Sequence, residues 1–242
     1  MRKAFVAVAM VATLSFAATA RAQLAYSFEA PPVNPDGFGP NGGGVTVTQA
    51  TIGATQGLSS MKVSVVAGAT FVGALSTVVP VTPGGAVLNN PPGVDSVLFD
   101  MTINQGDAYA GAGFDVLGIT IFGSNVPAGQ FGLQAQFAPL IHIDGKAAGQ
   151  YLNLSIPLTG ATNPLTFTAN QTFNQIFTAG VPNASQLNPS GFEFFINKSN
   201  DAPTTVYIDN VRLVASVPEP ASLGLLSMAG MVLGFVSRRR RG

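Results

Sequence analysis

The segment TVYIDNVRLV at residues 205–214 is rich in β-branched and aromatic residues, which favour a β-strand. Similar runs recur along the chain, separated by Gly, Pro, Asn and Asp residues that favour turns. Asp144-Gly145 predicts a hairpin loop between two of these runs. The other strands are predicted near residues 24–29, 45–50, 60–66, 71–79, 96–103, 118–122, 131–137, 140–143, 150–156 and 191–197.

This succession of short strands predicts an all-β fold, an antiparallel sandwich of two sheets. Long helices do not alternate with the strands, which disfavours a parallel α/β sheet. One short helix is predicted at residues 171–177, where Phe173, Ile176 and Phe177 share a face. The Gly-rich stretch 37–44 is predicted to be a flexible loop or an edge, and Asp107 and Asp115 are predicted to lie in loops.

Charge is distributed unevenly along the chain. The 11 basic and 11 acidic residues balance overall, but seven of the basic residues lie near the two ends. Residues 23–217 therefore hold four basic and ten acidic residues, a net charge of −6. This charge argues against nucleic acid as a partner and leaves carboxylates available for cations. The absence of cysteine excludes disulfides and thiolate metal sites.

The first 22 residues are predicted to be a signal peptide. Arg2 and Lys3 precede an apolar stretch at residues 4–18, and Ala20-Arg21-Ala22 has the small-x-small pattern of a cleavage site. We expect signal peptidase to cut after Ala22. The alternative is an uncleaved anchor helix, for which the apolar stretch is short.

The last 25 residues have the order expected of a membrane tail. Pro218-Glu219-Pro220 precedes an uncharged apolar run at residues 221–236, and Arg238, Arg239, Arg240 and Arg241 follow. The run predicts a transmembrane helix about 24 Å long. The arginines are expected to stay on the cytoplasmic side, which places the body, residues 23–217, on the far side. The alternatives are a buried terminal helix and a basic tail that binds nucleic acid.

This tail, residues 218–242, resembles the PEP-CTERM sorting signal of exported bacterial proteins. The resemblance implies that an exosortase, a membrane-embedded protease, processes the chain and recognises Pro218, Glu219 and Pro220. It also implies export, transient membrane anchoring, and a final location at the cell surface or in the extracellular matrix.

The body has a second resemblance. Tyr26-Ser27-Phe28-Glu29, the segment GLSSMKV at residues 57–63 and the segment VYIDNVRL at residues 206–213 look like the first and last strands of jelly-roll carbohydrate-binding modules. The resemblance implies a structural calcium ion held by Glu29 and Asp209. Calcium prefers several hard oxygen ligands, which agrees with two carboxylates on neighbouring strands. The alternative is that both are ordinary surface or edge carboxylates.

No catalytic constellation is recognisable in the sequence. His142 is the single histidine, and its alternation with Ile141 and Ile143 predicts a solvent-facing position. Sugar binding generally uses aromatic ring faces, and Tyr109 and Tyr151 are the candidates in this Trp-free chain. The leading hypothesis is therefore a non-enzymatic, exosortase-sorted surface or matrix protein. A carbohydrate-binding module for extracellular polysaccharide is the alternative, and a glycan hydrolase is a distant third.

Overall fold

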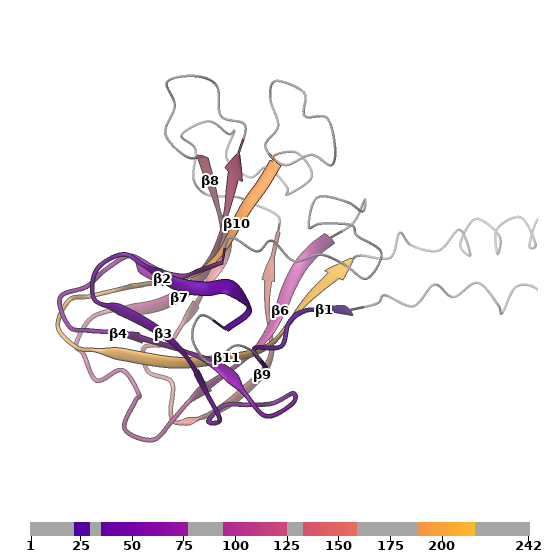
Figure 1. Cartoon of the computed structure of the whole chain (residues 1–242). Coiled ribbons are helices and arrows are strands. Elements are labelled where there is room, and N and C mark those ends of the chain that lie inside the picture. Colours follow the sequence, from indigo (N-terminus) through magenta and orange to yellow (C-terminus); the bar gives the residue numbers. More distant parts are fainter. Residues whose placement is uncertain (1–21, 30–34, 77–93, 125–132, 159–187, 216–242) are drawn as a thin grey trace, which may run out of the picture. The chain divides into compact units, whose positions relative to one another are not determined.

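The structure of the protein is a computed structural model that describes residues 22–29, 35–76, 94–124, 133–158 and 188–215. These residues belong to one compact unit, Ala22–Ala215. The regular structure of the described residues consists of two antiparallel β-sheets and one short 3-10 turn, η1, at Pro35–Gly37 (Figure 1). The predicted signal peptide, the helix at 171–177 and the sorting tail lie outside the described residues. Within the described ranges, no helix is long and apolar enough to cross a membrane.

The first sheet, sheet A, is built around its longest strand, β11 (Thr204–Ala215). The strand order is β3-β4-β11-β6-β9, and β1 also pairs with β11. β4 pairs with the first half of β11 and β1 with residues 211–214 of its second half. The other strands are β1 (Ala22–Tyr26), β3 (Val45–Ala50), β4 (Ser60–Val65), β6 (Val94–Ile103) and β9 (Gly149–Pro157).

The second sheet, sheet B, has the order β2-β5-β10-β7-β8. Its central strand β10 pairs with β7 along almost its whole length, from Asn188 opposite Ser124 to Lys198 opposite Asp115. The strands are β2 (Phe38–Asn41), β5 (Val72–Ser76), β7 (Asp115–Ser124), β8 (Leu133–His142) and β10 (Asn188–Lys198).

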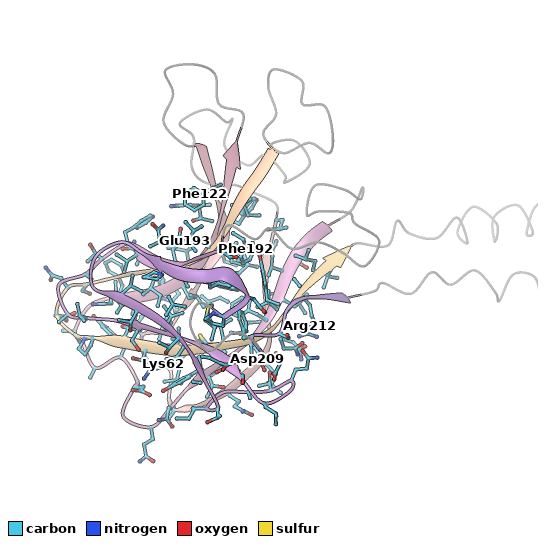
Figure 2. The ribbon with its side chains drawn as sticks, viewed as in Figure 1. Lys62, Phe122, Phe192, Glu193, Asp209 and Arg212 are labelled. Atoms are coloured by element: carbon cyan, nitrogen blue, oxygen red, sulfur yellow. The ribbon has the colours of Figure 1, made fainter. Side chains whose placement is uncertain are left out.

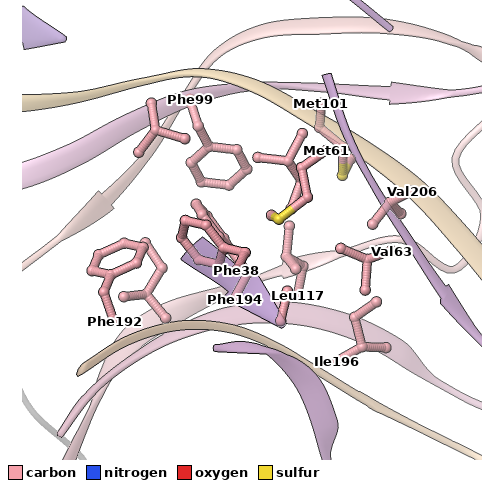
Figure 3. Close-up of a cluster of buried hydrophobic side chains, with 14 of the residues drawn as sticks. Phe38, Met61, Val63, Phe99, Met101, Leu117, Phe192, Phe194, Ile196 and Val206 are labelled. Carbon is pink, nitrogen blue, oxygen red and sulfur yellow. The ribbon is translucent and has the colours of Figure 1, made fainter. Parts of the chain in front are cut away.

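The core contains side chains from both sheets. Along β10, Phe192, Phe194 and Ile196 point to this core because alternate strand residues face the same side. Figure 3 shows Phe192 and Phe194 beside Phe38, with Phe99 and Met61 among the residues that close the cluster. Each fully buried side chain of this kind contributes about 1.5–3 kcal/mol through apolar burial. The large Phe content of the chain therefore stabilises the fold without cysteine.

Four local expectations need correction or refinement. Asp144-Gly145 does not form a hairpin loop, because it lies between β8 of sheet B and β9 of sheet A, which do not pair. The strands predicted at 131–137 and 140–143 are one continuous strand, β8, which contains Pro139. β8 lies at the end of the strand order in sheet B, where a proline without an N–H group is tolerated. The stretch 37–44 contains β2, which confirms the edge alternative for that segment. Asp115 is not a loop residue, because it begins β7 and is fully buried.

Candidate functional site

The outer side of sheet A carries two buried carboxylates next to each other. Asp100 on β6 is the register partner of Asp209 on β11, and their exposed fractions are 4% and 0%. The hydroxyl of Thr55, from the loop 51–59 that joins β3 and β4, lies 2.7 Å from Asp100 Oδ2 and 3.1 Å from Asp209 Oδ2. We call these three residues and Arg212 the carboxylate cluster; Figure 2 shows its Asp209 and Arg212 on β11.

Asp100 is well supplied with hydrogen-bond donors. Asn153 N donates to Oδ1 at 2.7 Å, Asn210 Nδ2 donates to Oδ2 at 2.9 Å, and Arg212 Nη2 lies 3.6 Å from Oδ1. Burial alone would raise the pKa of Asp100, but these hydrogen bonds, that of Thr55 and the arginine charge together lower it. Asn153 and Asn210 have φ angles of 55° and 51°, a left-handed conformation that asparagine tolerates.

Asp209 lacks an equivalent set of partners. Its Oδ2 atom accepts hydrogen bonds from the Thr55 and Gln56 amides, at 2.6 and 2.7 Å. Its Oδ1 atom is buried and has no hydrogen-bond partner among the described residues. Burial raises the pKa of Asp209, and the amide hydrogen bonds only partly oppose this rise. Such an oxygen fits either a proton or a bound cation.

Glu29 lies at the other end of the same loop. Its Oε1 atom accepts hydrogen bonds from the amides of Leu58 and Ser59, at 2.9 and 3.2 Å. The 51–59 loop therefore holds both carboxylates that the sequence predicts as calcium ligands, but it presents N–H donors to them. Within the described ranges, no three or more His, Asp or Glu residues are grouped as metal ligands. Of the carboxylate oxygens in these two groups, Asp209 Oδ1 is buried without a hydrogen-bond partner in the part of the chain that the structure describes, whereas Glu29 Oε1 has two.

The outer face of sheet B carries an aromatic pair. Phe195 of β10 is 2% exposed, and its ring stacks on Phe71 with centroids 5.2 Å apart and an interplanar angle of 24°. Phe71, just before β5, is 49% exposed. Gly118 of β7 makes room for the pair, because a Cβ there would overlap the Phe195 ring and lie 2.7 Å from Leu140. We call Phe71, Phe195 and Leu140 the apolar platform.

Polar groups lie next to the platform on the same face. Glu193 is two residues before Phe195 on β10, and neither belongs to the core cluster, so both side chains lie on the outer face of the sheet. Asn41 Nδ2 donates to Glu193 Oε1 at 2.7 Å. Burial raises the pKa of Glu193, although this hydrogen bond opposes the rise. Thr120 lies opposite Glu193 on β7, and its buried hydroxyl has no partner among the described residues.

The two predicted tyrosines have local partners of their own. The Tyr109 hydroxyl donates to Asp201 Oδ1, which joins the loop at 104–114 to the residues before β11. The Tyr151 hydroxyl donates to Ala147 O at 2.7 Å, and Lys146 Nζ lies 4.5 Å from the ring centroid. Tyr151 is on β9 of sheet A, so it does not share a sheet with the apolar platform.

Tyr109 and Tyr151 are the only aromatic residues predicted from the sequence as sugar-binding candidates, so the sequence-based candidates do not include the platform. The alternation in GFEFFIN, residues 191–197, places Glu193 and Phe195 on one face and Phe192, Phe194 and Ile196 on the other. This pattern was available in the sequence. The contribution of Phe71 was not, because it depends on the pairing of β5 with β10.

A third polar cluster lies where β7 begins and β10 ends. Thr204 Oγ1 donates to Asp115 Oδ2, while Asp115 Oδ1 is buried without a partner in the described part of the chain. Lys198, 1% exposed, donates to Ala202 O at 2.6 Å. Burial raises the pKa of Asp115 to about 6, although the hydrogen bond from Thr204 and the charge of Lys198 lower it. His142 is exposed, as predicted, and lies 3.1 Å from Asp144 Oδ1.

The PEP-CTERM protein-sorting motif matches residues 216–241. The chain therefore carries this sorting signal, and its match begins at the residue after β11. The recognition residues Pro218, Glu219 and Pro220 and the arginines at 238–241 lie within the match but outside the described residues. No curated protein matches the chain.

Solved structures similar to this chain include two carbohydrate-binding modules. The family 11 module of the cellulosomal cellulase Lic26A-Cel5E of Clostridium thermocellum is 14% identical, with a TM-score of 0.47 and coverage of 82% of this chain and 97% of that chain. The CBM22-1 xylan-binding domain of Paenibacillus barcinonensis Xyn10C is 12% identical, with a TM-score of 0.44 and the same coverage. A Stig cyclase from Fischerella sp. TAU is 16% identical, with a TM-score of 0.43 and coverage of 83% and 100%.

Proposed function

We propose that this protein is an exported cell-surface or extracellular-matrix protein that an exosortase processes, and that its β-sandwich body is non-enzymatic. The observation that carries the proposal is the sorting motif at residues 216–241, directly after the last strand. In this proposal signal peptidase cuts after Ala22, and the helix at 221–236 holds the chain in the membrane. The exosortase then acts at residues 218–220 and the body reaches the surface.

Mass spectrometry of the two ends of the mature protein tests this proposal. We expect Gln23 as the new N-terminus and loss of the residues after the sorting motif. Glu219→Ala should leave the tail attached, because it changes the recognition residue, whereas Asp201→Ala, an exposed acid of the body, should be processed normally. Recovery of the intact chain from the cytoplasm would overturn the proposal.

A second candidate function for the body is binding of extracellular polysaccharide on the outer face of sheet B. The supporting observation is the apolar platform beside the polar groups of Glu193 and Asn41. An exposed aromatic ring packs against the C–H face of a sugar, and carboxylate and amide groups hydrogen-bond to hydroxyls. Phe71, the most exposed ring of the platform, is expected to make the main contact.

Glycan-array binding distinguishes this candidate from a purely structural body. Phe71→Ala should abolish binding, and Phe114→Ala provides a matched control because its exposed fraction is 48% against 49% for Phe71. Loss of binding with Tyr109→Ala or Tyr151→Ala would support the sequence-based candidates instead. Polysaccharide turnover that disappears with a single Asp substitution would favour the hydrolase hypothesis.

The proposal for the body includes the jelly-roll topology and a structural calcium ion. The unpartnered Oδ1 atom of Asp209 would supply one ligand, and Glu29, held by the same loop, would supply the second carboxylate. Bound calcium would supply positive charge to a group of buried carboxylates and would join the first and last strands through the 51–59 loop.

A further inference from the structure

Strand β1 holds the predicted signal cleavage point inside the fold. Ala22 pairs with Val214 and Gln23 pairs with Leu213 of β11. The peptide bond between Ala22 and Gln23 is the one that we expect signal peptidase to cut. In the folded protein this bond therefore lies in an antiparallel ladder.

The end of β1 and the residues that follow it are anchored in the core. Tyr26 and Phe28 are 4% and 0% exposed, and the Tyr26 ring lies 4.8 Å from that of Phe38. The amides of Ser27 and Phe28 both donate to Asp36 Oδ2, at 2.8 and 2.7 Å. These contacts hold β1 in its position beside β11.

The same pairing fixes the segment before the sorting motif. β1 covers residues 211–214, β11 ends at Ala215, and the motif match begins at residue 216. Two residues, Ser216 and Val217, separate the strand from Pro218. The recognition residues therefore follow the paired strand almost directly in the sequence.

We infer that β1 acts as a clasp that docks on β11 after the signal peptide is removed and then fixes the chain immediately before the sorting motif. This inference rests on the proposed function. A peptidase needs an open, extended substrate segment, so a paired β1 must undock before it can be cut. β11 is the last strand of the described residues, and cleavage precedes docking as long as the signal is cut before β11 is exported.

The full 242-residue precursor and purified signal peptidase in detergent provide the test. One sample is folded, and the other is unfolded in urea and diluted directly into the assay. We expect the folded precursor to be cut at least about tenfold more slowly, because cleavage follows the small population with β1 undocked. Asp36→Ala should raise the rate for the folded precursor. Asp201→Ala, which removes a similar pair of hydrogen bonds from Tyr109 and Ala112, should not.

Each outcome decides the inference. Equal rates for the folded and unfolded precursor would overturn the clasp and leave the export proposal intact, whereas no cleavage of either sample would overturn both.

A second measurement does not depend on the peptidase. Gln23→Cys combined with Leu213→Cys should form an intramolecular disulfide in this cysteine-free chain. Gln23→Cys with Val206→Cys should not, and failure of the first pair to oxidise would overturn the clasp.

Discussion

Asp100 on β6 lies directly opposite Asp209 on β11, and one threonine hydroxyl is within hydrogen-bond distance of both carboxylates. That hydroxyl carries a single proton and can donate to only one of them. Asp100 also has Arg212 at 3.6 Å, whereas Asp209 has a buried oxygen without a partner in the described part of the chain. This asymmetry makes Asp209 the position that a proton or cation would stabilise.

Removal of calcium should destabilise the processed protein. A ligand at about 100 times its dissociation constant stabilises the folded state by about 2.7 kcal/mol, which corresponds to a fall in Tm of roughly 5–10 °C on chelation. Thermal unfolding with and without EDTA measures this shift. Asp209→Asn should lose the response to EDTA, while Asp201→Asn at an exposed site should keep it. An unchanged Tm in the unsubstituted protein would contradict the calcium site.

Asp115 should give the protein a distinct pH dependence. Burial raises the pKa of Asp115 in the folded state to about 6, above its ordinary value of 3.8, so between these pH values the folded state binds a proton that the unfolded state has released. This group therefore favours folding at low pH, and its contribution of about 3 kcal/mol is lost as the pH rises from about 4 to about 6. Urea unfolding at several pH values should show this loss in the wild type.

Asp115→Asn provides the comparison for that measurement. The substitution removes the titrating group. Between about pH 4 and pH 6, the free energy of unfolding of the wild type relative to the variant should therefore fall by up to about 1.4 kcal/mol per pH unit, the slope for one proton. Lys198, Asp144 and Thr204 face the carboxyl group and remain in both proteins. A wild type and variant with parallel pH profiles would show that Asp115 does not titrate as described.

Gly57→Ala should be more harmful than an otherwise similar change at Gly68. Both glycines have left-handed φ angles, +76° and +86°, so alanine strains the backbone at either position. A Cβ at Gly57 would also overlap Glu29 Oε1, whereas a Cβ at Gly68 meets no atom within 4 Å. We expect a cost of about 1 kcal/mol at Gly68 and up to about 1 kcal/mol more at Gly57, because the exposed Glu29 side chain can move aside but then loses its hydrogen bonds to two loop amides. Equal losses in chemical denaturation would show that the Glu29 contact is unimportant.

Arg212→Met should destabilise the carboxylate cluster. The arginine donates to Asn153 Oδ1 at 2.8 Å and its charge helps to lower the pKa of Asp100. Its side chain is 20% exposed, so we expect a loss of about 2 kcal/mol, below the cost of breaking a fully buried pair. Lys146→Met, at a half-buried position whose ammonium group lies over the Tyr151 ring, should change stability by less than about 1 kcal/mol. Unfolding at pH 7 compares the two variants.

The strand pattern could be predicted because each strand has one face in the core. Alternation and turn residues located β3 at 45–50 without error and β4, β9 and β11 to within one residue at each end. β2 carries little pattern, since Gly39 and Pro40 dominate its four residues. Pro139 suggested a break in β8 because local sequence does not reveal that the strand lies at an edge.

The polar sites were harder to predict because they depend on pairing between distant strands. The resemblance of residues 206–213 points to Asp209 as a candidate ligand, but nothing in the local sequence points to Asp100. Asp100 becomes its neighbour only through the register of β6 with β11. Thr55 joins them only because the 51–59 loop folds over this part of the sheet. The calcium ligands, Tyr109 and Tyr151 remain predictions.

β11 is central in sheet A although it comes late in the sequence. This strand contacts β1, β4 and β6, yet it is also the final strand before the sorting motif. A chain terminated before β11 would lack a strand from the middle of sheet A and the sorting motif together. Every molecule that carries the motif therefore also contains the strand that sheet A needs to form.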